Sequence, residues 1–308
     1  MQTLLPSAPP LLQNSTPTQA PMLAPASACP ESSGPLTRGM PADKTPKDSE
    51  YLSTLERGLR VLRAFDATHP EMQLSEVAII TGLSPAVARR CLNTLVQLGY
   101  VAQYGRKFLL RPEVLSFGTS YLSSMNIDQI ILPPLQQLRD STGDSSSMAV
   151  LSGDDILYVA HVSTNRRIRL GASVGTRFPL HATSMGKVLL GFQDAAVIDA
   201  YLNRATMARF TERTVTTRNE LSARLETARS TGYDSALDEL DYGLVSVAVP
   251  VFDGSRRIVA AINCSTSTTR ISQDELVRTR LPLLRDAATE IGNALQRWPA
   301  LVHSLNPA

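Results

Sequence analysis

A signal that ends one helix is followed directly by a signal that begins the next in the segment Thr81-Gly82-Leu83-Ser84-Pro85. Glycine commonly ends a helix, serine is a preferred N-cap, and proline suits the first helical position. Residues 74–80 can form a short helix that ends at this turn, and residues 85–98 can form the helix that follows it. Two helices joined by so tight a turn predict a helix-turn-helix.

The segments on either side complete a small domain. Leucines at helical spacing predict an amphipathic helix over 55–65, built on Leu55, Leu59 and Leu62. Residues 100–104 and 108–110 have the pattern of two strands joined by a basic turn. Three helices followed by a hairpin predict a winged helix-turn-helix over residues 51–111.

A larger α+β domain with an antiparallel sheet is expected over residues 126–300, after a linker helix over 112–125. Apolar runs predict strands at 147–151, 156–162, 167–173, 244–252 and 257–264. Helical patterns cover 127–139, with a break at Pro133-Pro134, and then 182–192, 195–202, 218–230 and 272–297. The first fifty residues hold ten of the twenty prolines and no aromatic residue, so we expect a disordered tail there.

The net charge of +2 is unevenly distributed. Residues 51–111 carry eight Lys or Arg residues and four Asp or Glu residues. Residues 112–308 carry nineteen Lys or Arg residues and twenty Asp or Glu residues. A positive surplus confined to the small domain favours nucleic-acid binding by that domain alone.

Other features exclude whole classes of protein. The three cysteines, Cys29, Cys91 and Cys264, are too few and too scattered for a disulfide framework, which favours a reducing compartment. No apolar run approaches the length of a membrane span, and the N-terminus lacks a basic signal-peptide region. We therefore expect a cytoplasmic protein with no membrane partner. No metal or nucleotide motif is present, so no cofactor is expected.

The helix after the turn divides into two faces. Val87, Cys91, Leu95 and Leu98 form an apolar stripe, and polar or small residues lie opposite. Arginine and asparagine are the side chains that bond guanine and adenine edges in the major groove, while basic residues on a wing bind phosphates. The candidate residues for binding a double-stranded DNA operator are Ser84, Ala86, Arg89, Arg90, Asn93, Arg106 and Lys107.

Four segments together resemble the IclR family of bacterial transcriptional regulators over residues 51–298: Leu55-Glu56-Arg57-Gly58-Leu59, Leu74-Ser75-Glu76-Val77-Ala78, Leu95-Val96-Gln97-Leu98-Gly99-Tyr100-Val101 and Pro179-Leu180-His181-Ala182-Thr183-Ser184-Met185-Gly186-Lys187-Val188-Leu189-Leu190. Ala88-Arg89-Arg90 and Thr183-Ser184-Met185-Gly186 are most similar to the branch that controls catabolism of protocatechuate, 4-hydroxybenzoate and related β-ketoadipate-pathway compounds. The resemblance implies a winged helix, a linker helix that pairs subunits, and a GAF-like effector domain. It also implies a homodimer or homotetramer on repeated operator sites.

An acidic effector would need a partner for its carboxylate in an apolar cavity, and the helix start near 182–186 offers backbone N–H groups. The resemblance implies that the pocket is lined by Ser184, Met185, Leu244, Ser246, Asn263 and Ser265. Arg169 and His181 are further candidates for contacting the acid. The family's acidic position is here Ala236, and Asp238 and Glu239 are expected to be solvated charges or salt-bridge partners. The expected effector is an aromatic acid or a β-ketoadipate-pathway metabolite.

Two alternatives compete with a DNA-binding regulator. Ser184-Met185-Gly186-Lys187 fits the S-x-x-K motif of serine hydrolases with Ser184 as nucleophile and Lys187 as base, but the companion S-D-N and K-T-G motifs are absent. We therefore do not expect an enzyme. In the second alternative the winged helix binds a protein partner beside a metabolite-sensing domain, and the pattern of Arg89, Arg90 and Asn93 disfavours it.

Overall fold

The computed structural model describes residues 51–164 and 171–305. The expected disordered tail and Arg169 lie outside these residues. The first described region contains α1 (Ser53–Arg63), β1 (Glu71–Gln73), α2 (Leu74–Thr81), α3 (Pro85–Gln97), β2 (Val101–Tyr104) and β3 (Lys107–Leu110). The predicted helices and hairpin are therefore present. The sequence did not predict β1, which pairs with β3 to complete a sheet of order β1-β3-β2.

The turn between α2 and α3 forms as its residues predict. Gly82 ends α2 in the left-handed conformation, with φ of 63°, where a side chain would cause strain. The Ser84 side chain then caps α3 by accepting a hydrogen bond of 3.4 Å from the Val87 N–H. Local capping chemistry thus fixes the helix-turn-helix.

The core of this region differs in detail from the predicted stripes. On α3 the buried residues are Ala88, Cys91, Leu92 and Leu95, which follow i, i+3, i+4 and i+7 spacing. Leu98 was predicted to be buried, but it follows the last turn of α3 and is 60% exposed. On α1 the predicted apolar residues Leu55 and Leu59 are exposed, whereas Val61 is buried and Leu62 packs against the core.

The linker consists of a 3-10 turn at Pro112–Val114 and of α4 (Leu115–Ser124), which buries none of its residues. Next come α5 (Ile127–Ile130) and α6 (Leu132–Thr142). The interruption predicted at Pro133-Pro134 is confirmed, but the break falls just before these prolines, at Ile131. Proline is tolerated in the first turn of a helix because the N–H groups there have no intrahelical acceptor.

The larger region is an α+β domain, as predicted. Its strands are β4 (Ser145–Ser152), β5 (Asp155–Val162), β6 (Arg177–Pro179), β7 (Asp234–Leu237), β8 (Leu244–Phe252) and β9 (Ile258–Ser267). Its helices after α6 are the 3-10 turn Leu180–Ala182, α7 (Ser184–Gly191), α8 (Ala195–Arg204), α9 (Arg218–Thr231), α10 (Gln273–Leu295) and α11 (Pro299–Leu305). The strands form one antiparallel sheet of order β6-β5-β4-β9-β8-β7.

Three short elements of this domain, β6, β7 and α11, were not predicted. The strand expected at 167–173 is wrong where it can be checked, since residues 171–173 are irregular, and residues 165–170 lie outside the described part. Strand β6 instead pairs with β5 a few residues later, with Phe178 opposite Ile156. None of the described helices combines the length and apolar character needed to cross a membrane.

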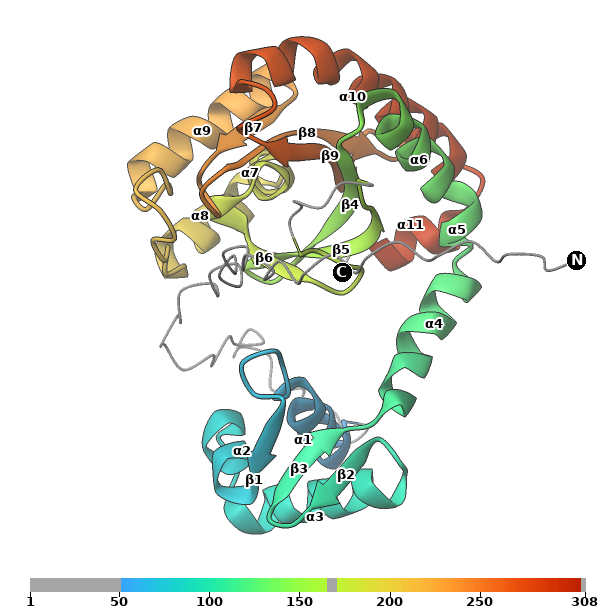
Figure 1. Ribbon diagram of the computed structural model, residues 1–308, viewed down its shortest axis with the longest axis vertical. Coiled ribbons are helices and arrows are strands. Elements are labelled where there is room, and N and C mark those ends of the chain that lie inside the picture. Colours follow the sequence, from blue (N-terminus) through green and yellow to red (C-terminus); the bar gives the residue numbers. More distant parts are fainter. Residues whose placement is uncertain (1–50, 165–170, 306–308) are drawn as a thin grey trace, which may run out of the picture. The chain divides into compact units, whose positions relative to one another are not determined.

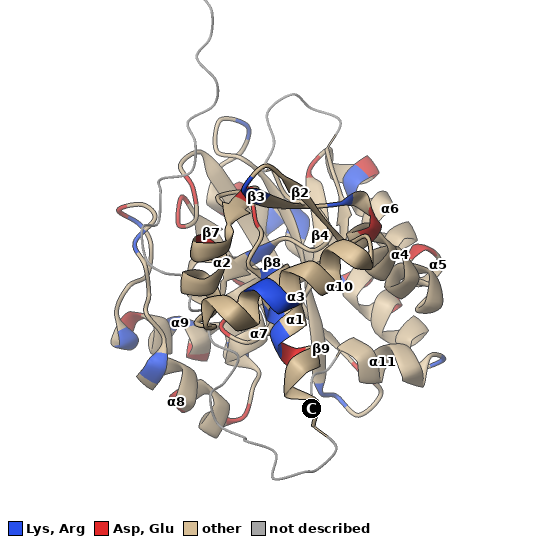
Figure 2. Cartoon of the chain, turned by 90° about the horizontal axis from the view of Figure 1, so that it is seen from below, with Lys and Arg blue, Asp and Glu red and all other residues tan. Residues whose placement is uncertain are grey.

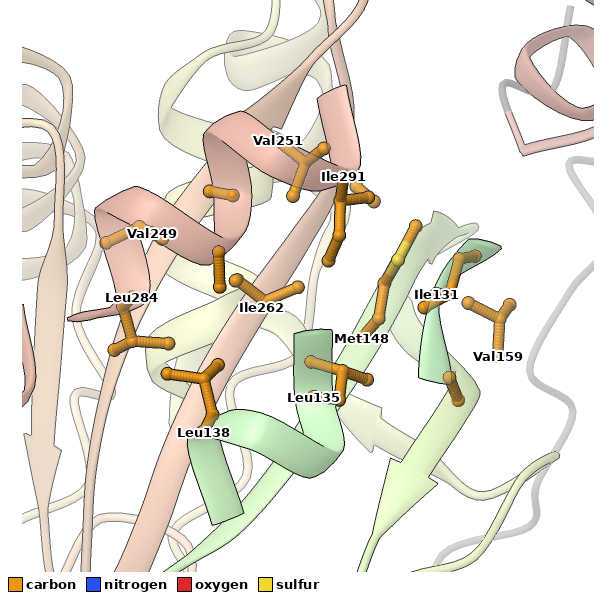
Figure 3. Close-up of a cluster of buried hydrophobic side chains, with 14 of the residues drawn as sticks. Ile131, Leu135, Leu138, Met148, Val159, Val249, Val251, Ile262, Leu284 and Ile291 are labelled. Atoms are coloured by element: carbon orange, nitrogen blue, oxygen red, sulfur yellow. The ribbon is translucent and has the colours of Figure 1, made fainter. Parts of the chain in front are cut away.

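The sheet curves around α7, while α6 and α10 cover its outer face (Figure 1). The outer face holds the largest apolar cluster, in which Leu135, Met148, Ile262, Leu284 and Ile291 interdigitate (Figure 3). Successive residues of a strand point to opposite faces, so Ile262 and Cys264 of β9 join this outer cluster. Asn263, which lies between them, therefore faces α7.

Candidate functional site

The exposed face of α3 is polar and basic, as predicted. Ala86, Arg89, Arg90 and Asn93 are all exposed. Arg89 and Arg90 are the only Lys or Arg residues of α3 and account for the blue segment on this helix in Figure 2. Within the described part of the chain neither forms an ion pair, so both guanidinium groups are available to a polyanion.

The wing presents one of its two predicted basic residues freely. Arg106 is exposed beside Gly105 at the tip of the hairpin. Lys107 is the first residue of β3, and its ammonium group forms a salt bridge with Glu71 of β1. This hydrogen bond and the nearby carboxylate raise the pKa of Lys107. Lys107 thus stays a predicted DNA-binding residue, with Glu71 as an additional partner that the sequence did not indicate, because β1 was not foreseen.

A pocket lies between the inner face of the sheet and the start of α7. It encloses about 370 Å³, its open mouth included. All six residues that the family resemblance implied line it, which are Ser184, Met185, Leu244, Ser246, Asn263 and Ser265. The remaining lining residues are Tyr158, Ala182, Thr183, Ala236, Glu239 and Leu240. Residues from four distant stretches of chain thus converge on one site.

The start of α7 forms one wall of this pocket. Thr183 is the N-cap and accepts a hydrogen bond of 3.1 Å from the Gly186 N–H. The N–H groups of Ser184 and Met185 precede that one and have no acceptor within the helix. A Cβ atom on Gly186 would lie 2.3 Å from the Leu180 carbonyl oxygen, so only glycine permits this close approach. The result is a helix N-terminus that can receive an anion.

Hydroxyl groups lie next to this helix start. The Ser184 and Ser246 hydroxyls are 2.9 Å apart and hydrogen-bond to each other. Ser265 on β9 is the register partner of Ser246 on β8. All three side chains are buried, and they can donate to or accept from a bound molecule.

Asn263 and Tyr158 contribute further polar atoms on the sheet side. Burial raises the pKa of Tyr158 well above its ordinary range, against the opposing effect of side-chain hydrogen bonds with Ser147 and Asn263. The Asn263 side chain is only 4% exposed, and its Oδ1 atom has no hydrogen-bond partner among the described residues. Tyr158 was not predicted as a site residue, because a tyrosine in an apolar strand has the pattern of a core residue.

A buried ionic network includes Glu239 of the pocket lining. Lys187 is completely buried, and its Nζ atom lies 2.6 Å from Glu239 Oε2 and 3.6 Å from Asp234 Oδ2. Arg224 of α9 completes the set, with 2.7 Å between its guanidinium and Asp234 Oδ1 and 3.5 Å to Glu239 Oε1. Desolvation lowers the pKa of Arg224, but the two carboxylates outweigh it and raise the pKa overall. Two positive and two negative charges leave the network neutral.

This network changes the interpretation of two residues. Glu239 is a salt-bridge partner, one of the two roles expected for it, but it is 5% exposed and lines the pocket. The S-x-x-K motif does not assemble as a nucleophile and base, because Lys187 contacts Glu239 while Ser184 contacts Ser246.

His181 was a further candidate for contacting the acid. It is buried in the 3-10 turn before α7, where its Nε2 atom lies 2.9 Å from the Ala208 carbonyl oxygen and its ring stacks on Phe210. It is absent from the pocket lining. Among the described residues no cluster of His, Cys, Asp and Glu side chains could hold a metal ion.

Comparisons with known proteins agree with this arrangement. Residues 54–105 match the IclR helix-turn-helix domain, and residues 119–293 match the bacterial transcriptional regulator IclR C-terminal domain. The chain is 37% identical to the Pca regulon regulatory protein of Pseudomonas putida, over 80% of this chain and 86% of that protein.

Two solved structures extend the comparison. A protein of Rhodococcus sp. RHA1 is 43% identical, with a TM-score of 0.68 over 80% of this chain and 99% of the other. The inducer-binding domain of a double mutant of the PobR transcription factor from Acinetobacter, in complex with 3-hydroxybenzoic acid, is 32% identical, with a TM-score of 0.50 over 52% of this chain and 94% of the other. The chain therefore belongs to the IclR family of bacterial transcriptional regulators.

Proposed function

We propose that a small organic acid binds in the pocket at the start of α7 and thereby changes the affinity of the winged helix for a DNA operator. The observation that carries this proposal is the pocket itself. It combines a helix N-terminus with the buried hydroxyls of Ser184, Ser246 and Ser265, beside apolar residues such as Met185, Leu240 and Leu244. Unpaired N–H groups and hydroxyls stabilise a carboxylate, and enclosure by apolar residues suits a small carbon skeleton.

The class of acid follows from relatives. The similar Acinetobacter inducer-binding domain is in complex with 3-hydroxybenzoic acid, which is an aromatic acid. The proposed effector is an aromatic acid or a metabolite of its ring-cleavage pathway.

The DNA contacts are proposed for the exposed residues of α3 and the wing. Ser84, Ala86, Arg89, Arg90 and Asn93 would lie along the major groove, with the two arginines and the asparagine reading base edges. Arg106 would contact phosphates or a minor groove. Lys107 would contribute less, since Glu71 neutralises it.

Binding is favoured over catalysis at the pocket. A serine nucleophile needs a base within hydrogen-bond reach that can accept its proton. Lys187 instead forms ion pairs with Glu239 and Asp234, and Ser184 bonds to another serine. The S-x-x-K segment is therefore proposed to serve in binding and packing.

The proposal includes self-association. Leu115 and Phe117 of α4 and Leu55 and Leu59 of α1 are exposed apolar side chains. Pairing of two winged helices would match two operator half-sites. Light scattering on the full chain should then give twice or four times the mass of 33.4 kDa, and a monomer at micromolar concentration would contradict this part.

The test begins with selection of a duplex from a random library by the full chain, followed by fluorescence anisotropy on that duplex. We expect binding that weakens steeply with salt and that shifts when 4-hydroxybenzoate or protocatechuate is added. Thermal unfolding with the same acids should show a raised midpoint, since a ligand that binds only the folded state stabilises it. A chain that selects no duplex would contradict the DNA function. A thermal midpoint that no acid raises would contradict the sensor function.

A further inference from the structure

The pocket at the start of α7 is nearly filled by its own walls. Of its volume of about 370 Å³, most lies in the open mouth and in the narrow gaps between wall atoms, and the cavity itself measures about 20 Å³. A cavity needs roughly 10–15 Å³ to hold a single water molecule. An aromatic acid is several times larger than a water molecule. Binding of such an acid therefore requires one wall of the pocket to move.

Two walls of the pocket are fixed by their packing. All eight residues of α7 are buried. A Cβ atom on Gly191 of this helix would lie 2.9 Å from the Leu225 carbonyl oxygen, so α7 has no space into which it could shift. The sheet wall is built on β8 and β9, and each of these strands pairs with a neighbouring strand on both sides. Closely packed elements of this kind do not yield to a ligand.

The remaining wall is the loop that joins β7 to β8, in which Glu239 and Leu240 line the pocket. Residues 240–243 of this loop are called the strap below. No backbone hydrogen bond of normal geometry joins Leu240, Asp241 or Tyr242 to another described residue. Asp241 and Tyr242 are exposed, and Leu240 is half-buried. Segments with so few contacts open locally at a low cost in free energy.

The chain is anchored on both sides of the strap. Before it, the Glu239 side chain pairs with Lys187, and the Glu239 carbonyl oxygen accepts a hydrogen bond of 2.7 Å from the Thr214 hydroxyl. At its other end, the Gly243 carbonyl oxygen accepts a hydrogen bond of 2.9 Å from the Thr268 N–H. These contacts can persist while the residues between them move.

Two hydrogen bonds hold the strap in its closed position. The Gly243 N–H donates to Asp238 Oδ1 over 2.7 Å, and the Tyr242 hydroxyl accepts from the Glu212 N–H over 3.3 Å. Gly243 has a φ of 80°. A rotation about this angle would break the first bond and move Leu240. Glycine adopts positive and negative φ with similar ease, so Gly243 is suited to act as a hinge.

We propose that the strap is a gate, and that the acid enters only when residues 240–242 rotate about Gly243 and withdraw Leu240 from the pocket. The inference rests on the proposed function and concerns how the acid reaches its site. The apparent affinity is then reduced by the fraction of molecules in the open form. A change that raises this fraction should speed association and tighten binding by the same factor. Dissociation should not change, because the acid occupies the open form.

The test is Gly243→Ala in the full chain. Alanine is strained at a φ of 80°, and its Cβ would meet only Thr268 Oγ1, at 4.0 Å, so the closed strap is disfavoured without a clash. For whichever of 4-hydroxybenzoate and protocatechuate binds, we expect the association rate constant to rise by about fivefold to thirtyfold. Calorimetry gives the dissociation constant, and nuclear magnetic resonance exchange measurements on the acid's ring protons give the dissociation rate constant. Their quotient is the association rate constant.

Gly232→Ala is the matched control. Gly232 ends α9 with a φ of 78°, and a Cβ there would also meet a single atom at 4.0 Å. Both variants should lose similar stability in thermal unfolding, but Gly232→Ala should leave both rate constants unchanged. If Gly243→Ala does not fold, Tyr242→Phe removes only the acceptor of the Glu212 hydrogen bond, and association should then accelerate by about twofold to threefold.

Three results would overturn the inference. An association rate constant in Gly243→Ala within about twofold of the original value would refute the gate and leave the proposed acid sensor intact. The same conclusion would follow if Gly232→Ala accelerated association equally, since strain outside the strap would then suffice. If the original chain binds neither acid, the proposed function fails and the gate fails with it.

Discussion

Replacing Lys187 by methionine should destabilise the larger domain strongly. The side chain is completely buried, and methionine has a similar length without the charge. The substitution leaves Asp234 and Glu239 with only Arg224, so the buried network changes from neutral to a net charge of −1. Glu239 loses its contact of 2.6 Å and retains one of 3.5 Å.

The magnitude follows from measurements on other buried pairs. Removing one partner of a buried ion pair costs about 3–5 kcal/mol, because the remaining charge is left without compensation. For a domain of this size about 1 kcal/mol corresponds to about 2–4 °C in the unfolding midpoint. We therefore expect calorimetry to show a decrease of about 6–20 °C in Lys187→Met.

Two further variants make the interpretation specific. Lys187→Met combined with Glu239→Gln restores neutrality and should recover a substantial part of the lost stability. Arg278 and Glu275 form an equally short contact of 2.6 Å, but Arg278 is 71% exposed, so Arg278→Met should not shift the midpoint measurably. A midpoint for Lys187→Met within about 2 °C of the original would refute the reasoning.

Three other predictions concern the pocket wall, the DNA-binding surface and pH. Gly186→Ala should cost about 1–3 kcal/mol in calorimetric unfolding and weaken acid binding, because the new Cβ would lie 2.3 Å from the Leu180 backbone. Arg89→Ala should weaken binding to the selected duplex by about 1–3 kcal/mol in anisotropy. Burial raises the pKa of Asp253, but backbone hydrogen bonds and Arg257 outweigh it and lower the pKa below 3.8. Its contribution to stability is therefore present above that pH and lost in more acidic solution, so chemical denaturation should show Asp253→Asn less stable at pH 7, with the difference shrinking as the pH falls below 3.8.

Each of these three predictions has a control variant and a result that would contradict it. Gly118→Ala adds a methyl group where no atom lies within 4 Å, so it should fold normally, and equal stability of the two alanine variants would count against the packing argument. Lys107→Ala should weaken DNA binding less than Arg89→Ala because Glu71 already engages Lys107, and the reverse order would contradict the assignment. A stability difference for Asp253→Asn that stays constant from pH 7 to pH 2 would refute the electrostatic explanation.

Local chemistry made the helix-turn-helix predictable. The Gly82 stop, the Ser84 cap and the apolar spacing of α3 act over a few residues, and the structure has each of them. Strand β1 is only three residues long and exists because β3 lies beside it, so nothing in Glu71-Met72-Gln73 alone indicates a strand. Without β1, nothing in the sequence indicated that Glu71 would pair with Lys107.

The pocket was predictable only in part, because it too depends on contacts between residues far apart in the sequence. Family motifs identified Ser184, Ser246 and Asn263, whereas Glu239 belongs to an acidic stretch that has the pattern of a surface turn. Its burial depends on Lys187, which lies 52 residues away in the sequence. His181 directly precedes α7, yet the 3-10 turn directs its ring toward Phe210, and sequence spacing alone could not show this.

The central claim is that occupancy of the pocket and affinity for the operator are linked in one chain. Linkage is reciprocal, so the factor by which 4-hydroxybenzoate changes the dissociation constant of the selected duplex must equal the factor by which the duplex changes the dissociation constant of the acid. The decisive measurement determines both factors on the full chain, by anisotropy and by calorimetry in one buffer. The account predicts two equal factors that differ from one. If the acid binds and the duplex binds but both factors are one, the pocket does not regulate DNA binding and the account is contradicted.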